Sequence, residues 1–157
     1  MLDPGTITDA IVSALRTIPE LVLQMGGDPE KIYAHHYLYG SDVRLVEAVY
    51  RIVPPSILVV WDGTQGGNFD GQTIWKHRFQ LHIRTANVAG ISEPTSYEKV
   101  WFLLVNGSVY GGSLNIRQVN LLPELDLMEV PSIGHRQDEE LMDYFVGTFI
   151  FPEIGDN

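Results

Sequence analysis

The five histidines have the widest chemical repertoire of any side chains in this sequence, because imidazole can bind metals and transfer protons near neutral pH. They are His35, His36, His77, His82 and His135. Neighbouring residues of a strand point to opposite faces, so His35 and His36 are not expected to share an ion, and the odd spacing separates His77 from His82 in the same way. The sequence has no cysteine. It also places no carboxylate at a convincing ligand spacing, so we predict no metal site and no cofactor.

The glycine-rich segment 63–71, GTQGGNFDG, resembles a phosphate-binding loop only in composition. The phosphate loop requires a lysine and a hydroxyl residue after its second glycine, and the dinucleotide fingerprint requires a helix to follow. A strand is predicted to follow here, and no Gly-x-Ser-x-Gly elbow is present. We therefore interpret the segment as a flexible hairpin tip and predict that the protein is not an enzyme. An alternative stays open, a small-ligand-binding domain or an enzyme that uses His35, His36 or His77 with a carboxylate.

Two predicted strands flank this segment. Residues 56–62 form an apolar run typical of a buried strand, and residues 75–84 alternate in type. With a period of two, the second strand has one mainly apolar face and one polar, largely cationic face. The apolar face carries Trp75, His77, Phe79, Leu81 and Ile83, and the basic face carries Lys76, Arg78, Gln80, His82 and Arg84. We expect the apolar face to build the core and the basic face to meet an acidic neighbour.

Helical spacing precedes and follows this predicted hairpin. The first helix is expected to begin at a Thr6 cap and to end near Thr17 or restart at Pro19. Further helices are predicted over residues 42–52 and 95–107, and strands over 116–121, 125–130 and 141–152, with a loop over 131–140. The order predicts one α+β domain over residues 1–157, a mostly antiparallel sheet with helices packed on one face and a long β-hairpin extension.

The composition restricts the partners. The chain has 157 residues, 45% of them hydrophobic, and a formal net charge of -10. General binding to a nucleic-acid backbone needs clustered lysine and arginine, so it is disfavoured. No signal segment is predicted, and no apolar run approaches the roughly 20 residues that cross a bilayer. We expect a product of the cytoplasm that does not contact a membrane.

The aromatic residues divide into two groups. Most of them, including Trp61, Trp75 and Trp101, are predicted to lie in one core between helix and sheet. Four others fall on an extended arm or on the hairpin tip: Tyr33, Tyr37, Tyr39 and Phe69. Exposed aromatic residues are enriched where proteins contact proteins, so these four are candidates for such a contact.

Several motifs in order resemble one family. They are LRTIPEL over residues 15–21, PSILVVWDG over 55–63, WKHRF over 75–79, VWFLLVNG over 100–107 and DEELMDYF over 138–145. Together they resemble the tail terminator and neck proteins of long-tailed bacteriophages, over most of the chain.

The resemblance implies a virion protein made in the host cytoplasm, without enzymatic activity. It implies a ring, commonly of six copies, that caps the tail tube, contacts the tail-tube protein and the head-completion or connector protein, and lets DNA pass through its lumen. A net charge of -10 would make that lumen acidic, so that DNA slides without binding. We assign protein contacts by region, to Tyr33, Tyr37, Tyr39, Gly66, Phe69, Lys76, Arg78, Arg84, His135 and Arg136.

Overall fold

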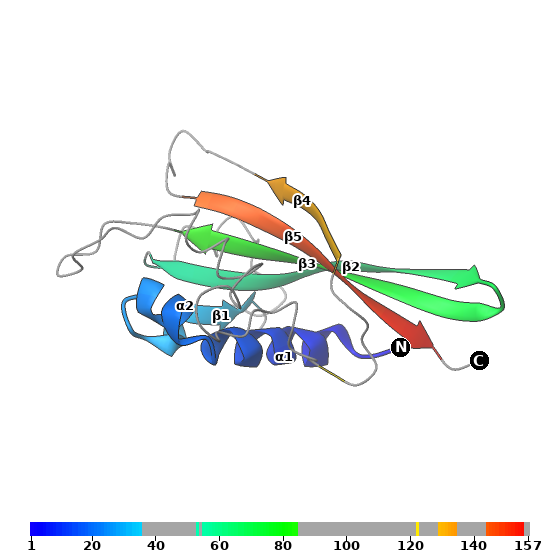
Figure 1. Ribbon diagram of the computed structural model, residues 1–157, viewed down its shortest axis with the longest axis horizontal. Coiled ribbons are helices and arrows are strands. Elements are labelled where there is room, and N and C mark those ends of the chain that lie inside the picture. Colours follow the sequence, from blue (N-terminus) through cyan, green and yellow to red (C-terminus); the bar gives the residue numbers. More distant parts are fainter. Residues whose placement is uncertain (36–52, 54, 85–121, 123–128, 135–143, 156–157) are drawn as a thin grey trace.

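The computed structural model describes residues 1–35, 53, 55–84, 122, 129–134 and 144–155 (Figure 1). Within its strands, residues 69, 129–134, 144–145 and 154–155 are described by their backbone alone. The predicted helices over 42–52 and 95–107 and the predicted strand over 116–121 lie outside the described residues. No helix of the described part is both long and apolar enough to cross a membrane.

The N-terminal segment forms two consecutive helices, α1 (Pro4–Arg16) and α2 (Pro19–Gln24). The expected Thr6 cap is wrong, because α1 begins at Pro4 with Asp3 in the N-cap position. Proline suits the first turn, where its missing N–H would have no partner within the helix. The same reason explains the restart at Pro19. Both predicted outcomes occur, because α1 ends beside Thr17 and α2 begins at Pro19.

A glycine turn leads from the helices into the sheet. Gly26 and Gly27 have φ angles of 79° and 80°, a left-handed conformation that favours glycine. The carboxylate of Asp28 then accepts a hydrogen bond of 2.9 Å from the amide of Glu30. This contact starts a short 3-10 helix, η1 (Pro29–Lys31), which runs directly into strand β1 (Ile32–Ala34).

The strands form one mixed sheet in the order β1-β2-β3-β5-β4. The other strands are β2 (Ser56–Phe69), β3 (Gln72–Arg84), β4 (Glu129–Gly134) and β5 (Tyr144–Gly155). β1 and β2 are parallel, and the three other pairings are antiparallel. The predicted α+β class is therefore confirmed. The predicted loop over 131–140 is wrong at its start, since residues 131–134 belong to β4 and residues 132–134 pair with β5.

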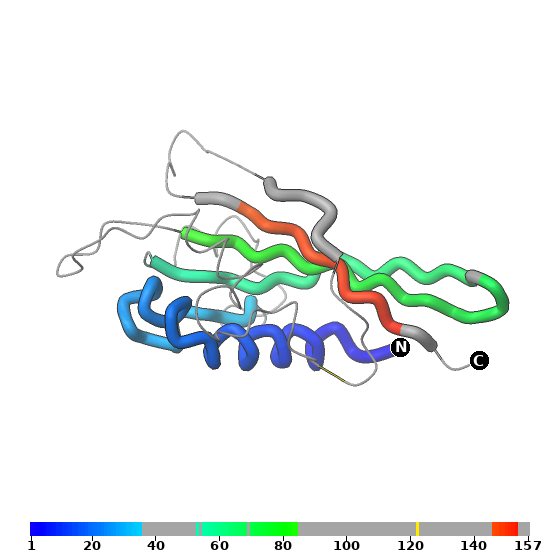
Figure 2. The backbone as a smooth tube through the Cα atoms, viewed as in Figure 1, coloured from blue at the N-terminus to red at the C-terminus, as the bar shows by residue number. Residues whose placement is uncertain are grey.

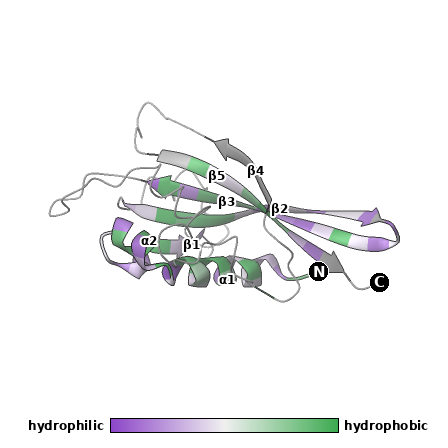
Figure 3. Cartoon of the chain, viewed as in Figure 1, coloured by the Kyte–Doolittle hydropathy of each residue, from purple (hydrophilic) through white to green (hydrophobic). Residues whose placement is uncertain are grey.

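The hydrophobic core brings together the apolar side chains of α1, α2 and the sheet (Figure 3). α1 contacts β1 and β2. Phe79 and Phe151 meet edge to face, with ring centroids 5.9 Å apart. Trp61 was expected in this core, and that expectation is wrong, because 46% of its surface is exposed.

The predicted basic face of β3 is not uniformly open to solvent. Lys76 and Arg78 are exposed, but His82 and Arg84 at the other end of the strand are buried. Leu58, which lies opposite His82 on β2, is also fully buried although it does not belong to the main core cluster. The expectation of a basic surface along the whole strand is therefore wrong, and its exposed part is confined to the end near the hairpin turn.

Candidate functional site

A long β-hairpin projects from the body of the molecule (Figure 1). Its strands are β2 and β3, and β5 runs beside β3 as far as the pair Thr73–Gly155. The register between β2 and β3 shifts between Trp61 and Thr64. Such a bulge bends and twists a strand. We call residues 62–78, which follow this bend, the hairpin arm; Figure 2 shows both of its strands reaching past the end of β5.

The hairpin arm ends in a two-residue turn. Asp70 has a φ of 49° and Gly71 a φ of 78°. Positive φ at both central residues is typical of the tight turn whose twist matches antiparallel strands, and Asp-Gly is a preferred sequence for it. Residues 63–71 were predicted to form the tip of the hairpin, and that prediction is wrong in extent, because residues 63–69 belong to β2 and only Asp70 and Gly71 turn.

Gly66 and Trp75 lie directly opposite each other across the hairpin arm. A Cβ atom placed on Gly66 would lie 2.4 Å from Cζ3 of the Trp75 ring. The glycine is therefore required by close packing, since the indole occupies the space that a side chain would need. A Cβ atom on the neighbouring Gly67 would meet nothing within 4 Å.

The outer surface of the hairpin arm is polar (Figure 3). Arg78 Nε lies 3.2 Å from Asp62 Oδ2, and Gln80 Nε2 donates a 3.1 Å hydrogen bond to the same oxygen. Both charged partners are about half exposed, at 51% and 42% of their side-chain surface. An ion pair in that setting contributes little to stability. Lys76 is exposed beside this pair.

A chain of hydrogen bonds, exposed at Trp61 and buried at His77 and Glu153, lies at the root of the hairpin arm. Trp61 Nε1 donates to Thr64 Oγ1 over 3.1 Å, and Thr64 Oγ1 lies 2.8 Å from His77 Nδ1. His77 Nε2 lies 2.7 Å from Glu153 Oε1. The amide of Leu2 donates to both oxygens of Glu153, at 2.9 and 3.1 Å. We call Trp61, Thr64, His77 and Glu153 the root network.

One protonation pattern satisfies every member of the root network. An indole N–H can only donate, so Thr64 Oγ1 accepts a hydrogen bond from Trp61. The Thr64 hydroxyl can then donate its own hydrogen bond to His77 Nδ1. His77 Nε2–H then donates to the carboxylate of Glu153. The network therefore positions an imidazole between a hydroxyl group and a carboxylate.

Burial by itself raises the pKa of Glu153, but the opposing interactions are together stronger. The backbone hydrogen bond from Leu2, the side-chain hydrogen bond from His77 and the positive charge of the N-terminal ammonium hold this pKa below its ordinary value of 4.5. That ammonium group, on Met1, lies 3.7 Å from Glu153 Oε2. Glu153 is therefore ionised at neutral pH and ties the start of α1 to β5.

The root network has the groups of a hydrolytic triad but places them differently. The hydroxyl group contacts Nδ1 and the carboxylate contacts Nε2, and the His77 side chain has no exposed surface. Thr64 Oγ1 also accepts the indole N–H of Trp61. In the part of the chain that the structure describes, no cluster of three or more histidine, aspartate or glutamate side chains could hold a metal ion.

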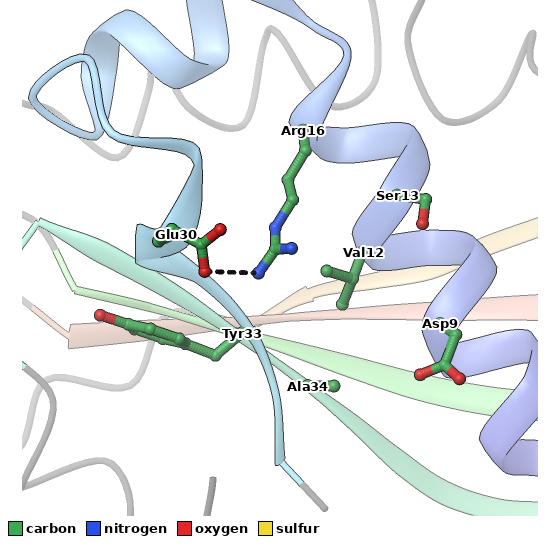
Figure 4. A pocket seen from close by; sticks show the side chains of 7 residues that line it. All are labelled: Asp9, Val12, Ser13, Arg16, Glu30, Tyr33 and Ala34. Carbon is green, nitrogen blue, oxygen red and sulfur yellow. Dashed lines mark ion pairs between the residues drawn. The ribbon is translucent and has the colours of Figure 1, made fainter. Parts of the chain in front are cut away.

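A groove of about 420 Å³ lies between α1 and β1 (Figure 4). Arg16 reaches from α1 toward Glu30, 3.8 Å away, and its Nη2 donates a 2.8 Å hydrogen bond to the carbonyl of Ile32. Tyr33 lines the groove and is half-buried. The groove is lined by both polar and apolar side chains, and its arginine holds β1 against the helix.

The structure brings only some of the predicted contact residues together. Gly66, Lys76 and Arg78 share the hairpin arm with the backbone of Phe69, whereas Tyr33 lies in the groove and Arg84 is buried at the far end of β3. Tyr37, Tyr39, His135 and Arg136 lie outside the described residues.

Sequence reasoning missed the root network. One signal was present, because His77 occupies an inward position among apolar residues of β3, and a buried polar side chain needs a hydrogen-bond partner.

The sequence matches no protein-family model, and no curated protein matches it. Function is therefore inferred from the residues and their geometry.

Proposed function

We propose that this chain is a structural assembly protein, a tail terminator or neck protein of a long-tailed bacteriophage. Its copies form a ring, of six subunits, that caps the tail tube and joins it to the head-completion protein in the virion. The residue motifs that resemble this family motivate the choice of system. The hairpin arm is the single structural observation that supports an assembly role.

The hairpin arm extends beyond the body and buries little of its own surface. Gln65, Gly66, Gly67 and Asn68 on β2 are exposed, as are Gln72, Lys76 and Arg78 on β3. β5 pairs with the β3 side of the arm as far as Thr73, but no described strand pairs with its β2 side. A long hairpin with few buried side chains gains most from packing against a second molecule, which is the requirement of an assembly protein.

The charge distribution supports contact through the hairpin arm. Residues 62–78 contain two acids and two bases, so the arm is neutral and the whole net charge of -10 lies on the rest of the chain. Acidic bodies facing a lumen would repel DNA and let it pass. The proposal includes helices that pack on one face of the sheet, and the contact of α1 with β1 and β2 supports this arrangement. Lys76 and Arg78 are exposed on the arm.

The test is assembly with and without the hairpin arm. Removing residues 66–69 together with residues 72–75 leaves Asp70-Gly71 as the turn between Gln65 and Lys76, a pair already in register. The shortened protein should fold, because the root network is retained, but should fail to form rings or to join tail tubes. Light scattering and electron microscopy, with and without the tail-tube protein, measure this. Wild-type protein that stays monomeric in both conditions would contradict the proposal.

The root network favours a second candidate function, an enzyme that uses His77 with Glu153. A hydroxyl–imidazole–carboxylate chain is the arrangement that activates a nucleophile in hydrolases. This candidate is second because His77 is completely buried and because Thr64 Oγ1 is already hydrogen-bonded to Trp61. Ester hydrolysis that is lost in a folded Thr64→Val variant would support the enzyme, and hydrolysis that is absent from the wild type would remove it.

A further inference from the structure

Among the strands that the structure describes, none pairs with the outer edge of β2 in the hairpin arm. β1 pairs with β2 only over Ile57, Leu58 and Val59. From Val60 to Phe69, no strand of the described residues lies beside this edge (Figure 1). Unpaired edges are templates for strand addition unless the sequence protects them.

Pro152 establishes which peptide groups of the hairpin arm face outward. It lies opposite Lys76 and has no N–H, so Lys76 and Pro152 form a non-hydrogen-bonded pair. The N–H and C=O of Lys76 must then point to β2, which makes Gln65–Lys76 a hydrogen-bonded pair. The two-residue turn agrees, because its closing pair, Phe69–Gln72, is bonded in such hairpins.

Alternation along β2 then fixes the rest of this edge. The peptide groups of Gln65, Gly67 and Phe69 point inward to β3. Those of Thr64, Gly66 and Asn68 point outward. The edge therefore presents three N–H and C=O sets, spaced two residues apart, to a neighbouring strand.

The other edges of the described sheet carry protection that this edge lacks. Arg16 donates from both Nε and Nη2 to the carbonyl of Ile32 on β1. Pro152 presents an outward position without N–H on β5, and β4 contains Pro131 beside a register shift. Charge, proline and bulges are the usual means of blocking an edge. From Gly63 to Phe69, β2 has neither a charged residue nor a proline.

We propose that Thr64–Phe69 pairs with an extended strand of a second copy of this chain, so that two sheets become continuous. The inference rests on the proposed function, in which copies assemble. The charge distribution points to a second copy as the partner. Outside the neutral arm the chain holds 18 acids and 8 bases, so the bodies of two copies repel each other. Contact through the arm therefore has the smallest electrostatic cost. Gly67, whose Cβ position is open, leaves room for the approaching backbone.

The test compares two variants at Asn68, of which only one lacks the outward N–H. Asn68→Pro deletes the N–H that the second strand would need, without touching a bond to β3. Asn68→Ala is the matched control, because both variants lose the 3.1 Å hydrogen bond from Thr73 Oγ1 to Asn68 Oδ1. Sedimentation velocity over a concentration series should show association of the wild type and of Asn68→Ala, with at least tenfold weaker association of Asn68→Pro. Equal association of the two variants would overturn strand pairing.

Amide hydrogen exchange gives a second readout that needs no proline. In the dissociated protein the Gly67 amide should exchange slowly and the amides of Gly66 and Asn68 quickly. On association the latter two should become at least tenfold slower. If the Gly66 and Asn68 amides still exchange quickly in the oligomer, strand pairing is overturned, but ring assembly is not. A wild type that is monomeric at every concentration would also overturn the inference, and the proposed function would fail with it only if the tail-tube protein induced no ring either.

Discussion

His77 Nε2 and Glu153 Oε1 lie 2.7 Å apart although 76 positions separate them in the sequence. Their side chains are 0% and 6% exposed. The contact joins β3 to β5 where the hairpin arm leaves the body, and Glu153 also holds the amide of Leu2. The base of the arm is therefore fixed to the N-terminal segment through one carboxylate.

Replacing Glu153 should destabilise the fold strongly. Glu153→Ala leaves the buried N–H of His77 and the amide of Leu2 without their acceptor. A buried donor left without a partner costs about 1–3 kcal/mol. Glu153→Gln keeps one acceptor oxygen and should cost about 1–2 kcal/mol. Urea unfolding followed by tryptophan fluorescence measures both. Glu30→Ala is the control, because Glu30 is 78% exposed and its ion pair with Arg16 is long; equal losses in the two alanine variants would contradict a structural role of Glu153.

Acid should remove the contribution of Glu153 to the free energy of unfolding. Its pKa is lower in the folded protein than its ordinary value of 4.5, so the unfolded chain takes up the proton first as the pH falls. The stabilisation is complete above about pH 5 and is lost as the pH falls through 4.5 and then through the lower folded pKa. The difference in unfolding free energy between wild type and Glu153→Gln should be constant above that window and shrink below it. A difference that does not change between neutral pH and the acid limb would contradict the lowered pKa.

Gly66 and Gly67 should differ in how much stability the same substitution costs. Gly66→Ala forces the Trp75 indole to shift and should lower the unfolding free energy by about 1–2 kcal/mol. Gly67→Ala places its methyl group in open space and should change it by less than about 0.5 kcal/mol. Thermal unfolding of both variants gives the comparison. In a Trp75→Ala background the cost of Gly66→Ala should vanish, and a cost that persists would show that the indole is not its cause.

Reversing the exposed charges of the hairpin arm should weaken association without unfolding the protein. With Lys76→Glu and Arg78→Glu the arm contains four acids and no base, so it repels the acidic body of a neighbouring copy. Sedimentation at low and high salt should show a loss of association that salt partly restores, because screening weakens repulsion between exposed charges. Lys76→Gln with Arg78→Gln is the uncharged control. An effect of charge reversal that is equal at both salt concentrations would show that electrostatics is not its cause.

Part of the fold could be predicted because it is determined by local preference. The alternation of residues 75–84 predicted β3, and Pro19 marked the start of α2, since proline has no N–H to lose in the first turn. The α+β class follows from the same local patterns. Glycine content, in contrast, predicted a hairpin tip as long as residues 63–71, whereas pairing with β3 extends the strand to Phe69 and leaves only Asp70 and Gly71 to turn.

The features of the candidate site also divide into those that the sequence predicts and those that depend on tertiary structure. The sequence by itself determined that residues 56–84 form a hairpin, that its end is rich in glycine and nearly free of charge, and that His77 points inward. Only the tertiary structure decided that Trp61 is exposed beside a bulge, that Arg84 is buried, and that Glu153 is the partner of His77. The physical reason is distance along the chain: backbone preference acts within a few residues, whereas burial and hydrogen-bond partners are chosen by strands that pair from opposite ends of the sequence.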